Sequence, residues 1–177
     1  GIHLGDKPAP TLLDMMRLDK RGNWRDVKVL LIDEISMMDS TLFDKLHWIG
    51  TQIRNISTKL MGGMQIIMSG DFLQLPPASN EPYCFNSKIW QQYVTRVVNL
   101  YQIVRQTDER FQAMLNRIRI GEITQDDRQL LNTRIVEKAP TNQFGIKPSK
   151  LFPFCKDVDE INKGYLTNLT QKGNVTI

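Results

Sequence analysis

The apolar and polar positions of this 177-residue chain predict strands alternating with helices. An apolar run broken only by Lys28 predicts a strand over 27–33 that is buried on both faces, and a second run predicts a strand over 64–69. Between them, a helix is expected from Asp39 or Ser40 to about residue 58. Its apolar stripe, predicted to be core, is Leu42, Leu46, Ile49, Ile53, Ile56 and Leu60. The pattern predicts an α/β fold with a parallel sheet.

Shorter elements are expected on either side of this unit. Residues 1–26 are mixed, and Pro8 and Pro10 exclude a long helix there, although Thr11 could cap a short one reaching Arg17. The later expected elements are a loop over 76–88, a helix over 87–93, a strand over 96–100, a helix from Thr107 or Asp108 to Ile120, a helix from Thr124 to about 132, a strand over 150–154 and a helix over 157–169. Residues 137–149 have the composition of a linker between domains.

Two adjacent carboxylates, Asp33 and Glu34, end the first predicted strand. Open α/β sheets bind ligands at the carboxyl ends of their strands. In nucleotide hydrolases this arrangement is the Walker B element, in which the first acid helps to hold Mg²⁺ and the second orients and deprotonates the attacking water. The competing interpretation is a buried strand that runs into an acidic turn.

The second predicted strand leads into Gly70-Asp71-Phe72-Leu73-Gln74-Leu75-Pro76-Pro77. Glycine permits a sharp turn at the strand end, and the proline pair imposes an extended exit. Between them, Gln74 carries an amide that can contact a phosphate oxygen or an ordered water. An isolated glutamine in a loop usually only interacts with solvent. This one follows a second predicted buried strand, as the glutamine of a nucleotide-sensing loop would.

Together these two motifs resemble the Pif (petite integration frequency) family of DNA helicases, which are RecD-like members of superfamily 1. Further segments are similar to motifs of this family: Phe43-Asp44-Lys45-Leu46, Ile53-Arg54, Gly62-Gly63-Met64-Gln65, Tyr101 to Gly121 with Arg105-Gln106, and Leu151-Phe152-Pro153 with Val158, Asn162 and Leu166. The resemblance therefore extends through nearly the whole chain. It implies a RecA-like P-loop NTPase fold that is partial here, with the start of a second RecA-like domain.

The resemblance also implies roles for individual residues. Asp33 would hold Mg²⁺, Glu34 would polarise the attacking water, and Gln74 would sense the γ-phosphate of ATP. Arg105 matches the family arginine that reaches the γ-phosphate across the cleft between domains, where an always-charged guanidinium suits the task. The alternative for Arg105 is a surface salt bridge with Asp108 or Glu109.

The DNA track is less well defined by the sequence. Arg54 and Lys59 are candidates for contacts to DNA phosphates, although exposed basic residues on a helix usually only interact with solvent. One of Phe72, Tyr83 or Phe85 could stack on a base, because single-strand tracks use aromatic side chains. The implied partners are single-stranded DNA and forked or structured DNA, bound by a monomer.

No Gly-x-x-x-x-Gly-Lys-Ser/Thr motif occurs in the chain, so it lacks the backbone cradle and the lysine for the β- and γ-phosphates. We therefore expect an internal part of a longer helicase that is inactive as an ATPase by itself. The expected organisation is the later part of a first RecA-like domain (1–136, with a small insertion near 3–26), a linker (137–149) and the beginning of a second RecA-like domain (150–177).

The charge and the apolar content of the chain narrow the possible functions only slightly. The net charge of +4 is compatible with nucleic-acid binding without identifying it, and no apolar stretch is long enough to span a bilayer. The function expected from the resemblance is an ATP-dependent 5′-to-3′ DNA helicase acting in repair, recombination or telomere maintenance. Its compartment would be the nucleus or mitochondrion of a eukaryote, or otherwise the cytoplasm or a virus-infected cell. The alternative is a non-catalytic RecA-like module that binds nucleic acid or a partner.

Overall fold

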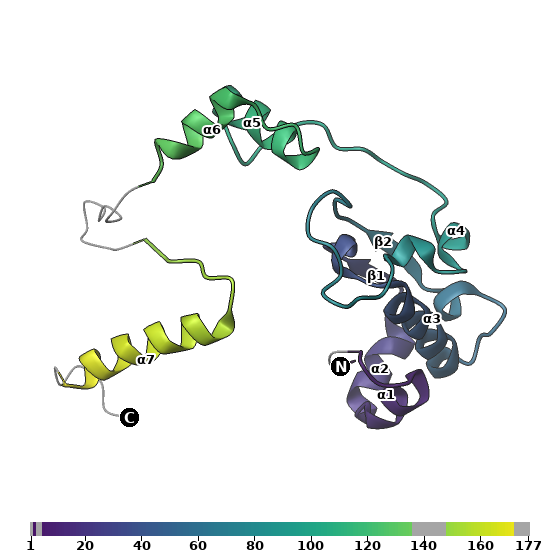
Figure 1. Ribbon diagram of the computed structural model, residues 1–177. Helices are drawn as coiled ribbons and strands as arrows, with labels where there is room; N and C mark the ends of the chain where they lie inside the picture. Colours follow the sequence, from purple (N-terminus) through teal and green to yellow (C-terminus); the bar gives the residue numbers. More distant parts are fainter. Residues whose placement is uncertain (1, 3–4, 136–147, 172–177) are drawn as a thin grey trace. The chain divides into compact units, whose positions relative to one another are not determined.

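The computed structural model describes residues 2, 5–135 and 148–171 (Figure 1). The chain divides into two compact units, Gly1–Thr124 and Gln125–Ile177. The first unit contains the sheet, the helices that cover it and both sequence motifs. The boundary between the units lies before residue 136, where the first RecA-like domain was predicted to end, and the predicted domain assignment stays a prediction.

The sheet of the first unit consists of two parallel strands, β1 (Val29–Ile32) and β2 (Gln65–Met68). Val29 lies opposite Gln65 and Ile32 opposite Met68, so both strands end at the same edge. This confirms the two predicted strands. The prediction that the first is buried on both faces was wrong: alternate residues are half-buried, whereas Val29 and Leu31 are exposed. No element of the described chain covers that face.

Helix α3 (Ser40–Arg54) connects the strands and lies against them. Asp39 caps it by accepting a hydrogen bond from the Leu42 N–H at 2.6 Å, as one of the two predicted caps. The helix ends earlier than predicted, because Asn55 takes a left-handed conformation. The expected stripe is only partly core: Leu46 and Ile49 are buried, Ile56 is exposed, and Phe43 is fully buried although it lay outside the stripe.

Two short helices, α1 (Ala9–Met15) and α2 (Leu18–Asp26), pack on α3. The buried side chains of Leu12 and Met16 meet Ile49 in one apolar cluster. The predicted Thr11 cap was wrong, because the helix already begins after Pro8. Pro10 lies in its first turn, where the missing N–H leaves no hydrogen bond unmade. The prolines thus start this helix.

The Arg54 guanidinium joins these helices to the sheet. Its Nε donates to the Gly62 carbonyl at 2.7 Å, and its Nη1 lies 3.1, 2.6 and 2.9 Å from the carbonyl oxygens of Trp24, Arg25 and Val27. Carbonyls at the end of a helix lack partners within that helix. Arg54 therefore supplies donors to the end of α2 and to the segment that enters β1.

Two short 3₁₀ helices flank α3, and after β2 the described part of the first unit contains another short 3₁₀ helix, a one-turn helix and one longer helix. Their bounds are η1 (Ile35–Met37), η2 (Leu60–Gly63), η3 (Cys84–Asn86), α4 (Trp90–Tyr93) and α5 (Glu109–Arg119). Asp108 caps α5 through the Phe111 N–H at 3.0 Å, and Gly121 follows its end with a positive φ, both as predicted. The strand predicted over 96–100 was wrong: these residues pair with no strand of the described chain, and Val97, Val98 and Leu100 are exposed.

The second unit contains α6 (Gln125–Asn132) and α7 (Cys155–Gln171), which confirm two predicted helices. The strand predicted over 150–154 was wrong, because a strand needs a neighbour to accept and donate its main-chain hydrogen bonds and no described segment does so here. Most of the predicted linker, residues 137–147, lies outside the described residues. In the part of the chain that is described, no helix has the length and apolar character needed to cross a membrane.

The half-buried side chain of His47 on α3 contacts η2 and α4. The Nδ1 atom of His47 accepts a hydrogen bond from the Met61 N–H at 3.2 Å and lies 2.7 Å from the Tyr93 hydroxyl. Burial lowers the pKa of His47 below 6.5, against a smaller opposing effect of Asp44. The folded state therefore binds fewer protons than the unfolded chain near this pH, and the neutral ring is the form that accepts from Met61.

We expect the free energy of unfolding to fall as the pH is lowered from 7.5 to 5, because the unfolded chain gains a proton on His47 that the folded state resists. Urea unfolding at a series of pH values would measure this. The same series on His47→Gln isolates the contribution, since glutamine does not titrate. Equal pH dependence in the two proteins would mean that His47 is not the acid-sensitive group.

Candidate nucleotide site at the carboxyl edge of the sheet

Asp33 and Glu34 lie at the carboxyl end of β1, beside the end of β2. Two main-chain hydrogen bonds of 2.9 Å join the strand ends, from Ser69 N to the Ile32 carbonyl and from Ile35 N to the Ser69 carbonyl. The Ser69 hydroxyl also donates to Asp33 Oδ1 at 2.7 Å, and the Glu34 N–H donates to the same oxygen at 3.0 Å. These hydrogen bonds lower the pKa of Asp33, so its exposed carboxylate is ionised at neutral pH.

The backbone at this edge is tightly constrained. Glu34 has a φ of 51° and a ψ of 46°, a left-handed conformation that is uncommon for residues other than glycine. Across from it, a Cβ atom at Gly70 would lie 2.8 Å from the Ile35 nitrogen, so only glycine fits there. Glu34 is exposed, and uncommon backbone conformations of this kind cluster at functional sites.

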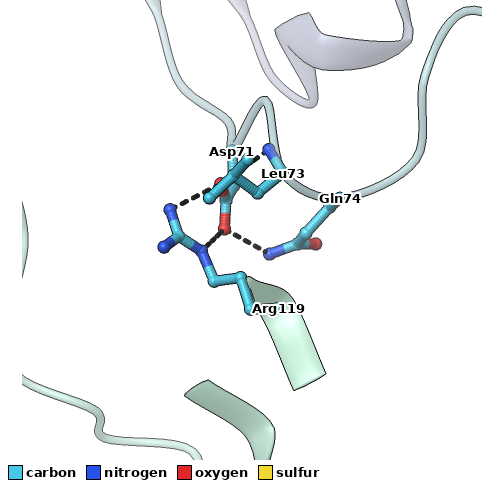
Figure 2. A network of polar contacts seen from close by, with 4 residues as sticks. All are labelled: Asp71, Leu73, Gln74 and Arg119. Atoms are coloured by element: carbon cyan, nitrogen blue, oxygen red, sulfur yellow. Dashed lines mark hydrogen bonds and ion pairs between the residues drawn. The ribbon is translucent and has the colours of Figure 1, made fainter. Parts of the chain in front are cut away.

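The loop after β2 is organised by Asp71, as Figure 2 shows. Its Oδ1 accepts from the Leu73 N–H at 3.1 Å and from Arg119 Nη2 at 2.8 Å. Its Oδ2 accepts from Gln74 Nε2 at 3.2 Å and from Arg119 Nε at 2.5 Å. The contact with Arg119 is the main reason that the pKa of Asp71 falls to about 2. Gln74 is thus held in place by an ionised carboxylate.

Sequence reasoning missed Asp71, Ser69 and Arg119. The position of Asp71, two residues beyond a strand at the same edge as Asp33, could have indicated it. Nothing in the sequence indicates Arg119, which lies 48 residues away at the end of α5.

The other predicted site residues do not join this edge in the described chain. Arg105 is exposed, and among the described residues its guanidinium has no contact with Asp33, Glu34 or Gln74 and forms no salt bridge with Asp108 or Glu109. Lys59 is exposed, and the described contacts of the Arg54 guanidinium are to main-chain carbonyls. DNA contact by either of them stays a prediction.

The aromatic side chains near the loop form a cluster. Tyr83 and Phe85 stack with ring centroids 5.1 Å apart, and Phe72 meets both rings edge-on. Phe72 also packs against the buried cluster of Ile35, Phe43 and Cys84, whereas Phe85 is 42% exposed. Of the three predicted candidates for base stacking, Phe85 has the most accessible ring.

The carboxylate of Asp33 is compatible with Mg²⁺. In the described part of the chain, no three acidic, histidine or cysteine side chains gather into a metal cage. Mg²⁺ at phosphate-binding sites is usually held by one or two carboxylates, water and the phosphates of the substrate itself. The exposed, ionised carboxylate of Asp33 meets that requirement. Both of its hydrogen bonds to described residues involve Oδ1, which leaves Oδ2 available for a metal ion.

Comparison with known proteins identifies relatives of the chain. A family model described as PIF1-like helicase matches residues 2–129. The ATP-dependent DNA helicase RRM3 of Saccharomyces cerevisiae is 34% identical over 177 residues, covering 96% of this chain and 24% of the relative. The ATP-dependent DNA helicase PIF1 of Danio rerio is 34% identical over 176 residues, covering 96% and 27%. The chain thus spans about a quarter of the length of these curated relatives.

Solved structures agree with this result. The crystal structure of the Pif1 helicase from Candida albicans is 35% identical with a TM-score of 0.80, covering 94% of this chain and 38% of that one. Pif1 from Bacteroides in complex with ADP-AlF3 and ssDNA is 26% identical with a TM-score of 0.73, covering 86% and 38%. These similarities confirm the predicted α/β, RecA-like fold class.

Proposed function

Because this chain belongs to the PIF1-like helicase family, we propose that it is the part of an ATP-dependent DNA helicase that carries the Mg²⁺ and water side of the ATPase site. The observation that supports this most directly is the joined edge of β1 and β2, where the Ser69 hydroxyl links the Asp33 carboxylate to the strand that leads into Gln74. Positioning and electrostatics supply most of the catalysis in phosphoryl transfer, and a rigid edge provides both.

Each residue at the edge has a chemical task in this proposal. The ionised carboxylate of Asp33 helps to hold Mg²⁺, which neutralises charge on the phosphates when bound. The carboxylate of Glu34 accepts the proton of the attacking water. Gln74 contacts that water or the γ-phosphate through its amide. Arg105 contacts the γ-phosphate when the two RecA-like domains close around ATP.

The proposed substrates are ATP and DNA, the latter single-stranded or forked and bound by a monomer that moves 5′ to 3′. Related structures include Bacteroides Pif1 bound to ssDNA and Pif1 helicases at forked dsDNA, which supports DNA as the partner. In this proposal residues 1–136 belong to the first RecA-like domain and residues 150–177 begin the second.

Strand separation tests the proposal. The full-length protein that contains this chain, supplied with ATP and Mg²⁺, should displace a duplex that has a 5′ single-stranded tail and leave one with only a 3′ tail intact. A protein that binds the tailed DNA but neither hydrolyses ATP nor separates either duplex would instead be a non-catalytic binding module. Unwinding from the 3′ tail alone would contradict the direction.

Arg105→Ala in the full-length protein should lower kcat for ATP hydrolysis roughly 10- to 100-fold, while affinity for single-stranded DNA without nucleotide stays near that of the wild type. The reason is that the charge of Arg105 acts only when ATP closes the two domains. Arg105→Lys should not restore kcat, since an ammonium lacks the planar fork of a guanidinium. Steady-state ATPase assays and DNA titrations measure both quantities.

Arg110→Ala is the matched control, because Arg110 is exposed, lies in the same stretch of chain and has no described ion pair. It should leave kcat within about twofold of the wild type. If Arg105→Ala behaved like this control, Arg105 would be a surface residue.

A further inference from the structure

The ion pair between Asp71 and Arg119 joins two segments that the sequence separates. Arg119 is the last residue of α5, and its Nε and Nη2 each donate to a different oxygen of the Asp71 carboxylate (Figure 2). Two parallel N–H···O bonds of this kind determine the plane of the carboxylate as well as its position. The Asp71 side chain is 20% exposed and that of Arg119 is 44% exposed, so the pair is partly shielded from water.

The orientation of the carboxylate determines how the Gln74 amide lies. Asp71 Oδ2, which receives Arg119 Nε, also accepts from Gln74 Nε2. An ionised carboxylate can only accept hydrogen bonds, so the NH₂ group of Gln74 must point toward it. The amide oxygen Oε1 of Gln74 is consequently left to accept a hydrogen bond from another donor, such as water. Asp71 further shapes the loop, because its main-chain carbonyl accepts from the Gln74 N–H at 2.9 Å.

Helix α5 connects Arg119 to the segment that carries Arg105. Asp108 caps α5, and the Gln112 side chain donates to the Gln106 carbonyl. These two hydrogen bonds attach the residues that follow Arg105 to the first turns of α5. One helix and one ion pair therefore link the stretch containing Arg105 to the loop containing Gln74.

We propose that Arg119 is a positioning residue, which orients the Gln74 amide through Asp71 so that Gln74 Oε1 accepts a hydrogen bond from the attacking water. This inference rests on the proposed function, because it assigns a task within ATP hydrolysis. Arg119 touches no reacting atom and acts only through Asp71. Its loss should therefore affect turnover through Gln74 and leave the contacts that bind ATP in place.

Steady-state ATP hydrolysis by the full-length protein at saturating single-stranded DNA provides the test. Arg119→Ala should lower kcat about tenfold and change the KM for ATP by less than about twofold, since the lost interaction orients the water in the transition state. Arg119→Lys should recover only part of kcat, because one ammonium cannot hold both carboxylate oxygens. Arg110→Ala, an exposed arginine on the same helix, should leave both constants near the wild-type values.

A double-mutant cycle shows whether Arg119 acts through Gln74. Gln74→Ala alone should lower kcat, and adding Arg119→Ala to it should cause almost no further loss, because the group that Arg119 positions is already gone. If the two losses multiply, or if Arg119→Ala matches Arg110→Ala, the positioning role is overturned.

Amide hydrogen exchange separates this inference from the proposed function. Exchange at Leu73 and Gln74 should accelerate in Arg119→Ala and not in Arg110→Ala, whether or not the protein hydrolyses ATP, because both N–H groups donate to Asp71. Unchanged exchange would overturn the inference even in an active enzyme. Accelerated exchange in a protein whose wild type hydrolyses no ATP would overturn the proposed function and, with it, the catalytic task assigned to Arg119.

Discussion

Glu34→Gln should lower kcat for ATP hydrolysis by about 10²- to 10⁴-fold in the full-length protein, the loss expected when a positioned general base is removed. The amide keeps the shape of the side chain but cannot take the proton of the attacking water. ATP affinity should remain close to the wild-type value, because the proposed partner of Glu34 is the water and not the phosphates. Single-turnover hydrolysis and equilibrium nucleotide binding measure the two effects separately.

Two variants control this experiment. Asp33→Ala should instead raise the Mg²⁺ concentration needed for half-maximal activity, which distinguishes a metal-holding carboxylate from a base. Glu34→Gly should be as inactive as Glu34→Gln, yet it should be more stable by up to about 1 kcal/mol, because glycine adopts the left-handed conformation without strain. A kcat for Glu34→Gln within a few-fold of the wild type would exclude Glu34 as the base.

Arg54→Ala should lower the free energy of unfolding by about 2–4 kcal/mol, since hydrogen bonds from a charged donor are strong and their acceptors lose their partner. The four carbonyl contacts of Arg54 tie α2 and the start of β1 to η2. Arg54→Lys should recover only part of this stability, because a lysine cannot reach several carbonyls in one plane. Urea unfolding of the 177-residue chain, followed by the fluorescence of its three tryptophans, reports on this region through Trp24 and Trp48.

The same variant tests the predicted DNA contact. Lys59→Ala is the matched control, because Lys59 is exposed and lies just beyond α3, and its loss should change stability by less than about 0.5 kcal/mol. If Arg54 instead contacts DNA phosphates, Arg54→Lys would unfold like the wild type while Arg54→Ala weakens single-stranded DNA binding and flattens its salt dependence. That outcome would contradict the structural role.

Sequence patterns predicted the elements whose causes are local. The first strand depends on its apolar run. Helices α3 and α5 depend on apolar spacing and on a capping side chain, Asp39 or Asp108, that accepts from an N–H three residues later. The adjacent placement of Asp33 and the Gln74 loop was likewise predictable, because parallel strands end at a common edge.

Tertiary structure alone decided the features that depend on residues distant in sequence. Two apolar stretches, 96–100 and 150–154, have strand-like composition but no neighbouring strand in the described chain, and pairing is what makes a strand. Arg54 was a candidate for DNA contact because it is a basic residue on a helix. In the folded structure its guanidinium instead contacts main-chain carbonyls. The pairing of Asp71 with Arg119 had no sequence signal at all, because a salt bridge across 48 residues arises only where the folded backbone brings the two side chains together.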